Sequence, residues 1–344
     1  SGDIPGLSKG DLLEHDIPLF PLPEQRRIVA KLDALQSRTR IAREALDAVA
    51  PLLKSFRQSV LQTAVTGALT EEWRGKQGES EPWKDVKIGS IVERIEAGKS
   101  LSCIESPPEG DQYGIIKISA VTWGKFDELE SKTLPDPTQF IESRRVKPGD
   151  FLISRANTLE LVGCPVIVGS VHRNLMLSDK VLRLVMPDGQ KEWVSIFLRS
   201  SDGRAQIEAR STGNQLSMRN IGQSALLDID IPLPPLAEQT EIVRRVQHLF
   251  AMADAMESEF AAAQRSVDQL DQSLLATAFR GELVPQDPSD EPASVLLERI
   301  RAARAIVPEA KGKRGRKASS DFDASLLMAA EPTAPKKRGR PAKL

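Results

Sequence analysis

The sequence predicts an α+β protein in which two long helices flank one α+β domain. One element of about 50 residues occurs twice, 214 positions apart, with no gap between the copies. The segment between the copies, roughly residues 83–229, occurs once, and its short apolar runs are broken by Gly, Pro, Asn and Asp. The duplicated part has the periodicity of helices, and the single-copy part has the texture of a mixed domain.

The repeat opens on the same proline-rich motif in both copies. Asp16–Gln25 reads DIPLFPLPEQ and Asp230–Gln239 reads DIPLPPLAEQ. The match continues through pairs of residues along each copy, which include Ile28 and Ile242, Leu35 and Leu249, Thr63 and Thr277, and Gly67 and Gly281. Because solenoid repeats have periods of about 20–50 residues, this spacing indicates a duplicated half-molecule instead. The pattern looks like that of a duplicated half-molecule without one of its two variable partners.

Each copy is predicted to form one long helix. Apolar or small residues recur alternately four and three apart from Ile28 to Gly67 and from Ile242 to Gly281. This heptad pattern favours left-handed supercoiling. Some 44 residues at about 1.5 Å each give a rod of about 65 Å. Gly67 and Gly281 stand where left-handed glycines end helices, and Pro51 should kink or break the first helix.

Two arrangements of these helices are compatible with the pattern. The shared register favours a coiled coil in which each helix buries its apolar seam against the other and the pair forms a stiff spacer. The alternative is two unrelated amphipathic helices, each packed on its own core.

The single-copy segment is predicted to be a compact α+β domain of about 150 residues. Expected strands are Tyr113–Ser119, Asp150–Ser154, Val166–Val171 and Lys180–Val185, and helices are expected near Val86–Ile95 and Glu192–Ser200. A turn at residues 147–149 leads into the strand that ends at Ser154. We therefore expect Ser154, Arg155, Asn157 and Thr158 to face outward from a rigid strand end.

Composition limits the class of protein. The chain has 344 residues, 40% of them hydrophobic and 4% aromatic, which suits a helix-rich protein of two or more domains. It has no apolar run of 18 residues and no secretory leader, which predicts a cytoplasmic protein without a membrane partner. Cys103 and Cys164 lack metal-ligand spacing, so we expect two buried free thiols and no metal site.

The C-terminal segment concentrates positive charge. Residues 311–344 contain ten Lys and Arg against three Asp and Glu, while the whole chain has a net charge of −1. This composition predicts a disordered basic tail. Its Arg338-Gly339-Arg340-Pro341 sequence resembles an AT-hook, in which glycine allows close approach and the arginines follow a narrow A·T minor groove. The alternative is a basic tail that only aids solubility.

Catalytic motifs are incomplete in this sequence. Ala97–Ser100 ends like a phosphate-binding loop, but Glu93 stands where the first glycine is required. No Asn/Asp-Pro-Pro-Tyr/Phe tetrapeptide of an amino-methyltransferase occurs. Glu130 and Lys132, with Asp111 or Asp127, could form part of a nuclease site. We expect no catalytic residues and keep the nuclease as an alternative.

The motifs, taken in order, resemble the specificity (S) subunit of type I restriction–modification systems. The resemblance rests on the paired proline motifs that open heptad helices, on Lys147–Arg155 (KPGDFLISR), and on Gly213-Asn214-Gln215 before the second motif. It covers about residues 1–285. The family typically has two target recognition domains held apart by two helices that pair antiparallel. Each domain reads one half of a bipartite DNA site, and the helices dock methyltransferase (M) subunits.

This resemblance implies a division of the chain. Residues 1–23 correspond to the tail of an upstream recognition domain whose body is absent, 24–69 to the first conserved helix, 70–82 to a linker, 83–236 to a target recognition domain, 237–283 to the second conserved helix, 284–310 to a partly helical extension, and 311–344 to the tail. Either the sequence is a fragment, or the protein is a half-subunit that acts as a homodimer.

The resemblance also implies partners and cofactors. The expected partners are double-stranded DNA, M subunits and a restriction (R) subunit. S-adenosylmethionine, ATP and Mg are expected on these partner subunits, with none bound by this chain. A coiled-coil scaffold that does not touch DNA is the alternative from a different functional class.

Base edges are read by bidentate Arg, Lys, Asn or Gln, and phosphates are bound by Lys, Arg and small hydroxyls. The candidate DNA-contacting residues of the domain are Lys117, Ser119, Ser154, Arg155, Asn157, Thr158, Lys180, Arg210, Asn214, Gln215 and Arg219. Arg155 and Asn157 are the predicted base contacts, and the others are predicted to hold the DNA backbone. Because residues 83–236 contain 19 Lys and Arg against 20 Asp and Glu, a basic face requires spatial sorting of charge.

Overall fold

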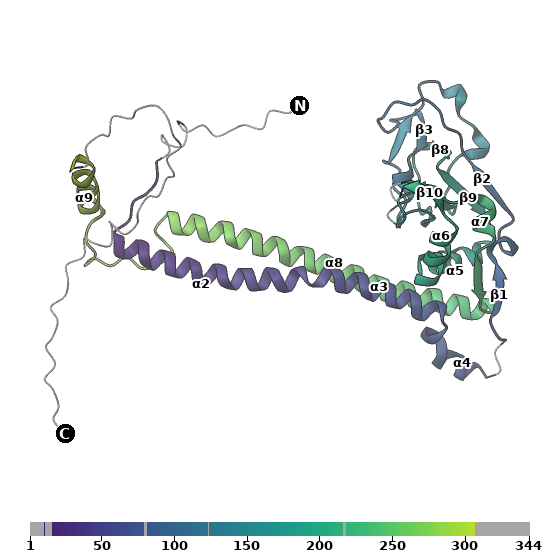
Figure 1. The fold of residues 1–344 in the computed structure, drawn as a ribbon, viewed down its shortest axis with the longest axis horizontal. Helices are drawn as coiled ribbons and strands as arrows, with labels where there is room; N and C mark the ends of the chain where they lie inside the picture. Colours follow the sequence, from purple (N-terminus) through teal and green to yellow (C-terminus); the bar gives the residue numbers. More distant parts are fainter. Residues whose placement is uncertain (1–9, 11–15, 79–80, 123, 216–217, 307–344) are drawn as a thin grey trace. The chain divides into compact units, whose positions relative to one another are not determined.

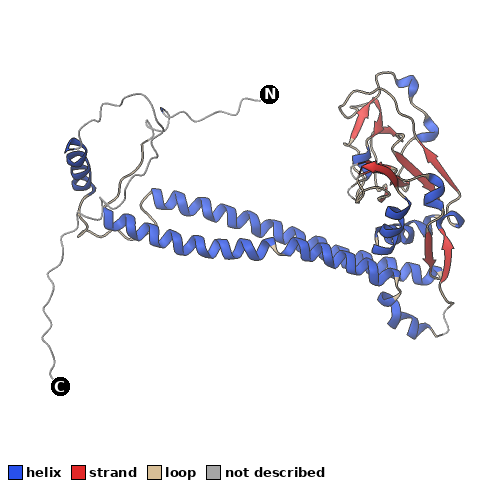
Figure 2. Ribbon diagram, in the orientation of Figure 1, coloured by secondary structure: helices blue, strands red, loops and turns tan. Residues whose placement is uncertain are grey.

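The computed structural model describes residues 10, 16–78, 81–122, 124–215 and 218–306. The chain divides into two compact units, Ser1–Val29 with Val284–Leu344, and Ala30–Leu283. The second unit contains the sheet domain and most of two long helical segments (Figures 1 and 2). In the first unit, helix α9 (Ala293–Ile306) lies within the extension that the sequence predicts to be partly helical.

The two repeat copies form the long helices that the heptads predict. The first copy gives α2 (Leu22–Asp47) and α3 (Val49–Val65), and the second gives the 44-residue helix α8 (Leu236–Phe279). Figure 1 shows α3 lying alongside α8. The α+β class, with two long helices beside one mixed domain, is therefore confirmed.

Ion pairs across the helices show that they run antiparallel. Arg43 lies 2.6 Å from Asp268 and 3.2 Å from Asp271, whereas Arg57 lies 2.8 Å from Asp254. A later residue of the first copy therefore pairs with an earlier residue of the second. The residue numbers add to 311 both for Arg43 with Asp268 and for Arg57 with Asp254, so one register holds over this stretch.

The helix of the first copy breaks where proline predicts it. Ala48 is the single residue between α2 and α3, and Pro51 lies in the first turn of α3. Proline has no N–H, so residue 51 cannot donate to the carbonyl of Asp47 and join the two helices. Gly67 and Gly281 have φ of +77° and +73°, which confirms the predicted left-handed conformation after each helical copy.

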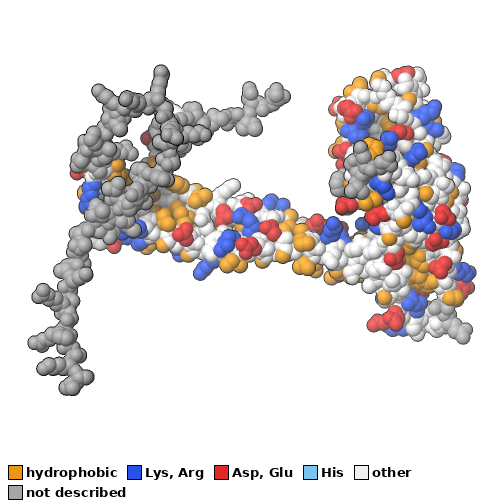
Figure 3. Space-filling view, viewed as in Figure 1, with side chains coloured by type: hydrophobic (Ala, Val, Ile, Leu, Met, Phe, Trp, Pro, Cys, Tyr) orange, Lys and Arg blue, Asp and Glu red, His pale blue; other side chains and the backbone are white. Residues whose placement is uncertain are grey.

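Burial along the helical seam is uneven. Val60, Leu61 and Ala64 of α3 are buried near the sheet domain, whereas the seam residues Met256 and Leu270 of α8 are exposed. Figure 3 shows apolar side chains among charged ones along the surface of the helices. The end of the pair nearest the domain is therefore the more tightly packed part.

The sheet domain is built from four small sheets. A four-stranded antiparallel sheet has the order β2 (Arg94–Ala97), β9 (Val181–Val185), β5 (Phe151–Ser154) and β7 (Pro165–Ile167). A three-stranded sheet has the order β4 (Ser131–Thr133), β3 (Tyr113–Ile116) and β8 (Asn174–Met176). A second three-stranded sheet has the order β10 (Thr212–Gln215), β11 (Met218–Asn220) and β6 (Ala156–Asn157). The pair of β1 (Lys84–Lys87) with β12 (Asp230–Leu233) joins the two ends of the domain.

Helices complete the domain and its connection to the long pair. They are α4 (Glu71–Gln77), α5 (Asp188–Arg199), α6 (Ser201–Arg210) and α7 (Gln223–Leu227), with short 3-10 turns η1 (Ala68–Thr70), η2 (Ile88–Ser90), η3 (Ile118–Val121), η4 (Pro137–Gln139) and η5 (Glu142–Arg144). Of the helices in the described part of the chain, none combines the length and the hydropathy of a membrane span.

Strand β5 has a core on each of its faces because neighbouring strand residues point to opposite sides. Phe151 and Ile153 join one apolar cluster with Trp193 of α5, and that cluster also includes residues of α3 and α8. Leu152 joins a second cluster with Ile116. The inner end of the helix pair therefore shares a core with the sheet domain.

A buried carboxylate fastens the linker between the first long helix and the domain. Glu238, 1% exposed at the start of α8, accepts hydrogen bonds from Thr70 Oγ1 at 2.7 Å, from Trp83 Nε1 at 2.8 Å, and from Arg74. The predicted linker, residues 70–82, thus begins at the last residue of η1 and contains α4, and Glu238 of the second proline motif bonds to it.

Several local predictions are corrected by the structure. The helix expected at Val86–Ile95 is wrong, because this segment forms β1, η2 and β2. Pairing of β1 with the distant β12 decides the conformation there, as it often does for short amphipathic segments. The strand expected at Val166–Val171 ends at Ile167. Cys103 and Cys164 are free, but each is half-buried and not fully buried.

Candidate nucleic-acid interface

Backbone hydrogen bonds bring several predicted residues to one part of the domain. Arg155 N donates to the Lys180 carbonyl oxygen at 2.8 Å, and Ile221 N donates to the Arg155 carbonyl oxygen at 3.0 Å. The turn before β9 therefore lies beside the β10–β11–β6 sheet. The Arg155 side chain is exposed and has no side-chain partner among the described residues, so its five N–H donors are available.

Asn157 and Thr158 lie next to Arg155 but are engaged within the domain. Asn157 Nδ2 donates to Thr122 Oγ1 at 3.2 Å, and its Oδ1 accepts from Thr158 N at 2.8 Å. Both side chains are half-buried. An asparagine needs both ends of its amide to read an adenine edge, so in this conformation Asn157 holds a loop in place.

Arg219 and Arg210 are also held by local partners. Arg219 donates to the carbonyl oxygens of Gly213 at 2.6 Å and Ser211 at 2.8 Å, which closes the β10–β11 hairpin. Arg210 lies 3.6 Å from Asp228, whose carboxylate also pairs with Lys87. The hydrogen bond from Lys87 lowers the pKa of Asp228.

Ser154 does not face outward, and that expectation is wrong. Its side chain is fully buried, and its Oγ donates to the Leu161 carbonyl oxygen at 2.6 Å and accepts from Cys164 N at 3.1 Å. Ser154 is still part of β5, where it pairs with Val181, so its hydroxyl is used to bind the loop that follows.

The remaining candidates cannot be placed in the same detail. Asn214 and Gln215 belong to β10, and their side chains lie outside the described part of the structure. Arg338, Gly339, Arg340 and Pro341 also lie outside the described residues.

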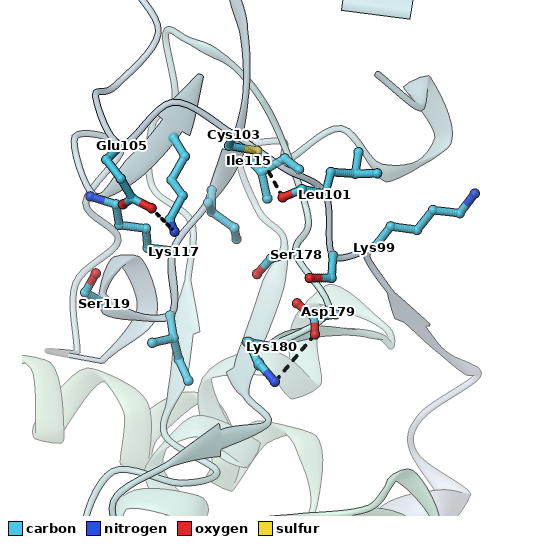
Figure 4. Close-up of a pocket in the computed structure, with 14 residues that line it drawn as sticks. Lys99, Leu101, Cys103, Glu105, Ile115, Lys117, Ser119, Ser178, Asp179 and Lys180 are labelled. Carbon is cyan, nitrogen blue, oxygen red and sulfur yellow. Dashed lines mark hydrogen bonds and ion pairs between the residues drawn. The ribbon is translucent and has the colours of Figure 1, made fainter. Parts of the chain in front are cut away.

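A cavity of about 490 Å³ gathers three of the predicted residues, Lys117, Ser119 and Lys180. Figure 4 shows its walls, which come from the end of β3 and η3, from residues 99–105, and from residues 178–180. Six other charged or hydroxyl residues line the cavity and were not among the predicted DNA contacts, namely Lys99, Ser100, Glu105, Lys132, Ser178 and Asp179. A signal existed for Lys99, which belongs to the glycine-lysine-serine segment considered above only as a nucleotide loop.

The charge of this cavity is positive. Four lysines line it against two carboxylates, Glu105 and Asp179, although the domain as a whole is nearly neutral. Lys132 Nζ lies 2.6 Å from Glu105 Oε1, and this hydrogen bond lowers the pKa of Glu105. Lys180 lies 3.5 Å from Asp179. Lysines therefore outnumber carboxylates locally at this cavity, as a basic surface on a nearly neutral domain requires.

The geometry around Glu130 differs from that of a nuclease centre. Glu130 accepts a hydrogen bond from Ser119 Oγ, whereas Lys132 turns to Glu105. Within the described residues, no group of three His, Cys, Asp or Glu side chains is placed to hold a metal ion.

Comparisons with known proteins define the family. The chain is 36% identical over 314 residues to the EcoKI type I restriction enzyme specificity subunit of Escherichia coli strain K12, covering 87% of this chain and 66% of that protein. It is 30% identical over 335 residues to the EcoBI specificity subunit of Escherichia coli, covering 90% of this chain and 68% of that protein. The chain belongs to the family of type I restriction enzyme specificity subunits.

The fold agrees with this assignment. It matches a chain from a structural study of complex assembly and conformational transition in the type I R-M system, with a TM-score of 0.58 and 24% identity, over 81% of this chain and 64% of that chain. The chain spans about two thirds of the length of the curated relatives that it matches. No family model matches it.

Proposed function

We propose that this chain recognises DNA sequence for a type I restriction–modification complex and reads one half of a bipartite target through its single sheet domain. The observation that carries this proposal is the exposed Arg155 in a member of the specificity-subunit family, whose guanidinium has no partner among the described residues. Its backbone N–H is bonded to Lys180, which lines the lysine-rich cavity. A guanidinium on a rigid strand end can bind a guanine edge through two hydrogen bonds. Nearby lysines can bind the phosphates that fix the register of the duplex.

The chain itself would make or break no bonds. Methyl transfer, ATP use and cleavage are assigned to M and R subunits, which would bind S-adenosylmethionine, ATP and Mg. The helix pair would dock the M subunits, and its exposed apolar residues, such as Met256 and Leu270, supply surface for that contact. A homodimer of half-subunits would supply two readers to one target.

Selection from a random-sequence DNA pool tests the proposal. The full chain alone should enrich one short half-site, and the complex with M subunits, in which a homodimer supplies the second reader, should enrich two copies of it separated by an unread gap. Arg155→Ala should relax the choice of one base at a cost of about 1–3 kcal/mol. Arg94→Ala, at an exposed arginine on β2, is the matched control and should leave the selected sequence unchanged. Enrichment of no sequence, with M subunits still bound, would support the scaffold alternative.

The basic tail is proposed to add affinity that does not depend on sequence. Deleting residues 311–344 removes ten positive charges, so general DNA affinity and its salt dependence should both fall. Binding titrations over a salt series would measure this. A changed target sequence after the deletion would refute this division of labour.

A further inference from the structure

The wall of the cavity is built around a glycine that cannot be replaced without moving the backbone. A Cβ atom at Gly98 would lie 1.9 Å from the Leu177 carbonyl oxygen. Gly98 N donates to the Ser178 carbonyl oxygen at 3.2 Å, and Lys99 forms a parallel bridge with Ser178. Glycine therefore allows two distant segments to meet, and their contact fixes Ser178 in the cavity wall.

Ser178 carries a hydroxyl with no protein partner. The residue is 8% exposed, and its Oγ has no hydrogen-bond partner in the described structure. Buried hydroxyls are normally hydrogen-bonded, so this one needs an explanation. In Figure 4 Ser178 lies between Lys117 and Ser119 on one side and Asp179 on the other. Its buried hydroxyl is therefore an unused hydrogen-bond donor at the cavity wall.

Two of the four lysines are available for such a group. Figure 4 shows that Lys99 extends away from the other labelled residues. Lys132 is bound to Glu105. The Lys117 side chain forms no hydrogen bond or ion pair with the described residues, although the Glu105 carboxylate acts on it electrostatically. The contact of Lys180 with Asp179 is long, at 3.5 Å. Lysine ammonium groups and a serine hydroxyl are a typical donor set for phosphate oxygens.

We propose that this cavity binds a phosphate group of the DNA backbone through Lys117, Lys180 and the Ser178 hydroxyl. The inference rests on the proposed function and assigns one site within it. Because Arg155 N is bonded to the Lys180 carbonyl, the bound phosphate and the exposed Arg155 belong to one rigid frame. The phosphate contact sets the register of the duplex, and Arg155 then meets a defined base edge.

Glu105 opposes this binding. Its exposed carboxylate holds Lys132 at the cavity wall and also acts electrostatically on Lys117. A phosphate entering the cavity must approach this negative charge. Removing the charge should therefore favour the bound state, an effect that a purely structural role for Glu105 does not predict.

Binding titrations with the full chain and M subunits test the proposal. They measure affinity for two duplexes, one that contains the selected half-site and one of unrelated sequence. Lys117→Gln and Lys180→Gln should each weaken binding to both duplexes equally, by about three- to tenfold, and reduce the salt slope by about 1. Glu105→Gln should strengthen binding about two- to fivefold. Lys84→Gln, at an exposed lysine of β1, is the control and should change neither value.

A thiol inside the cavity reports its occupancy directly. Cys103 lines the cavity, and Cys164→Ser leaves it as the only cysteine of the chain. Bound duplex should slow alkylation of Cys103, whereas inorganic phosphate or a free nucleotide at the same phosphate concentration should not. Protection by the free nucleotide alone would assign the site to a small molecule and overturn the proposal.

The results also separate this inference from the proposed function. Sequence-selective binding that is unaffected by Lys117→Gln and Lys180→Gln would overturn the phosphate site and leave the DNA-reading function intact. A change in which bases are selected would also overturn it, because a phosphate contact carries no base information. Absence of any sequence selection by the unmodified chain with M subunits would instead count against the proposed function.

Discussion

In both copies of the repeat, the glutamine of the opening motif donates its side-chain amide to the carbonyl oxygen five residues earlier. Gln25 Nε2 lies 2.7 Å from the Phe20 oxygen, and Gln239 Nε2 lies 2.8 Å from the Pro234 oxygen. The glutamate before each glutamine differs between the copies. Glu238 accepts from three side chains of the segment after the first helix.

Glu24 is nearly as buried, at 3% exposure, but its Oε1 has no hydrogen-bond partner in the described residues. The comparison separates two roles within one motif. The glutamine is a local device that fixes the entry of the chain into a helix. The glutamate accepts hydrogen bonds from a different segment where that segment has donors. In the second copy this segment leads into the sheet domain.

The largest expected loss of stability follows removal of the Glu238 carboxylate, and this change tests the difference between the two glutamates. Glu238→Ala leaves the Trp83 N–H and the Arg74 guanidinium without their acceptor, so unfolding free energy should fall by about 2–4 kcal/mol. Glu24→Ala, the matched change in the first copy, should cost less than about 1 kcal/mol because one of its oxygens is already unpaired. Urea denaturation of both variants measures the difference, and equal losses would show that the two glutamates have the same role.

The two glycines that follow the helices should also contribute unequally to stability, with the larger contribution from Gly67, which lies close to Arg74. Gly67→Ala meets both a left-handed backbone and a Cβ contact at 2.9 Å from Arg74 Nη1, so a loss of about 2 kcal/mol is expected. Gly281→Ala meets the same backbone conformation, and about 1 kcal/mol is expected. Thermal unfolding of both variants would show whether the contact with Arg74 adds to the loss of stability caused by the left-handed backbone. A larger loss at Gly281 would contradict this account.

Ion pairs across the helices should contribute least to the free energy of unfolding. Arg57 pairs with Asp254 and Glu257 at 2.8 Å and lies 5.7 Å from the Phe250 ring centroid, so Arg57→Ala should cost about 1 kcal/mol. Arg43 is more exposed than Arg57, so Arg43→Ala should cost less stability than Arg57→Ala. Raising the salt concentration should reduce both losses. A larger loss of stability at Arg43 than at Arg57 would contradict the weaker packing of the outer part of the helix pair.

The helices were accessible to sequence reasoning because their signals are local and repeated. The heptads, Pro51 and the two glycines act within a few residues of themselves, and the helices, the break and both left-handed glycines are confirmed. The pairing of β1 with β12 was not predicted, since its partners lie 143 to 149 positions apart, from Lys87 with Asp230 to Lys84 with Leu233. Long-range pairing of this kind leaves no periodic signal in a four-residue strand.

At the candidate site, too, long-range contacts could not be predicted from the sequence. Polar residue type predicts that Asn157 could read a base, but Thr122, 35 residues away, accepts from its amide. Lys99 and Ser178 meet only through a bridge that Gly98 permits. Residue type predicts which side chains could contact DNA, whereas the backbone path decides which of them are free to do so.

The most direct test of the helix pair as a rigid spacer is a matched insertion. Duplicating residues 38–44 in the first copy and 267–273 in the second repeats the pairing of Arg43 with Asp268 and adds one heptad to each helix. The added length is about 10 Å, or about three base pairs of DNA. DNA selection with the M-containing complex should then give two unchanged half-sites with about three more unread base pairs between them, and an unchanged gap would contradict the spacer.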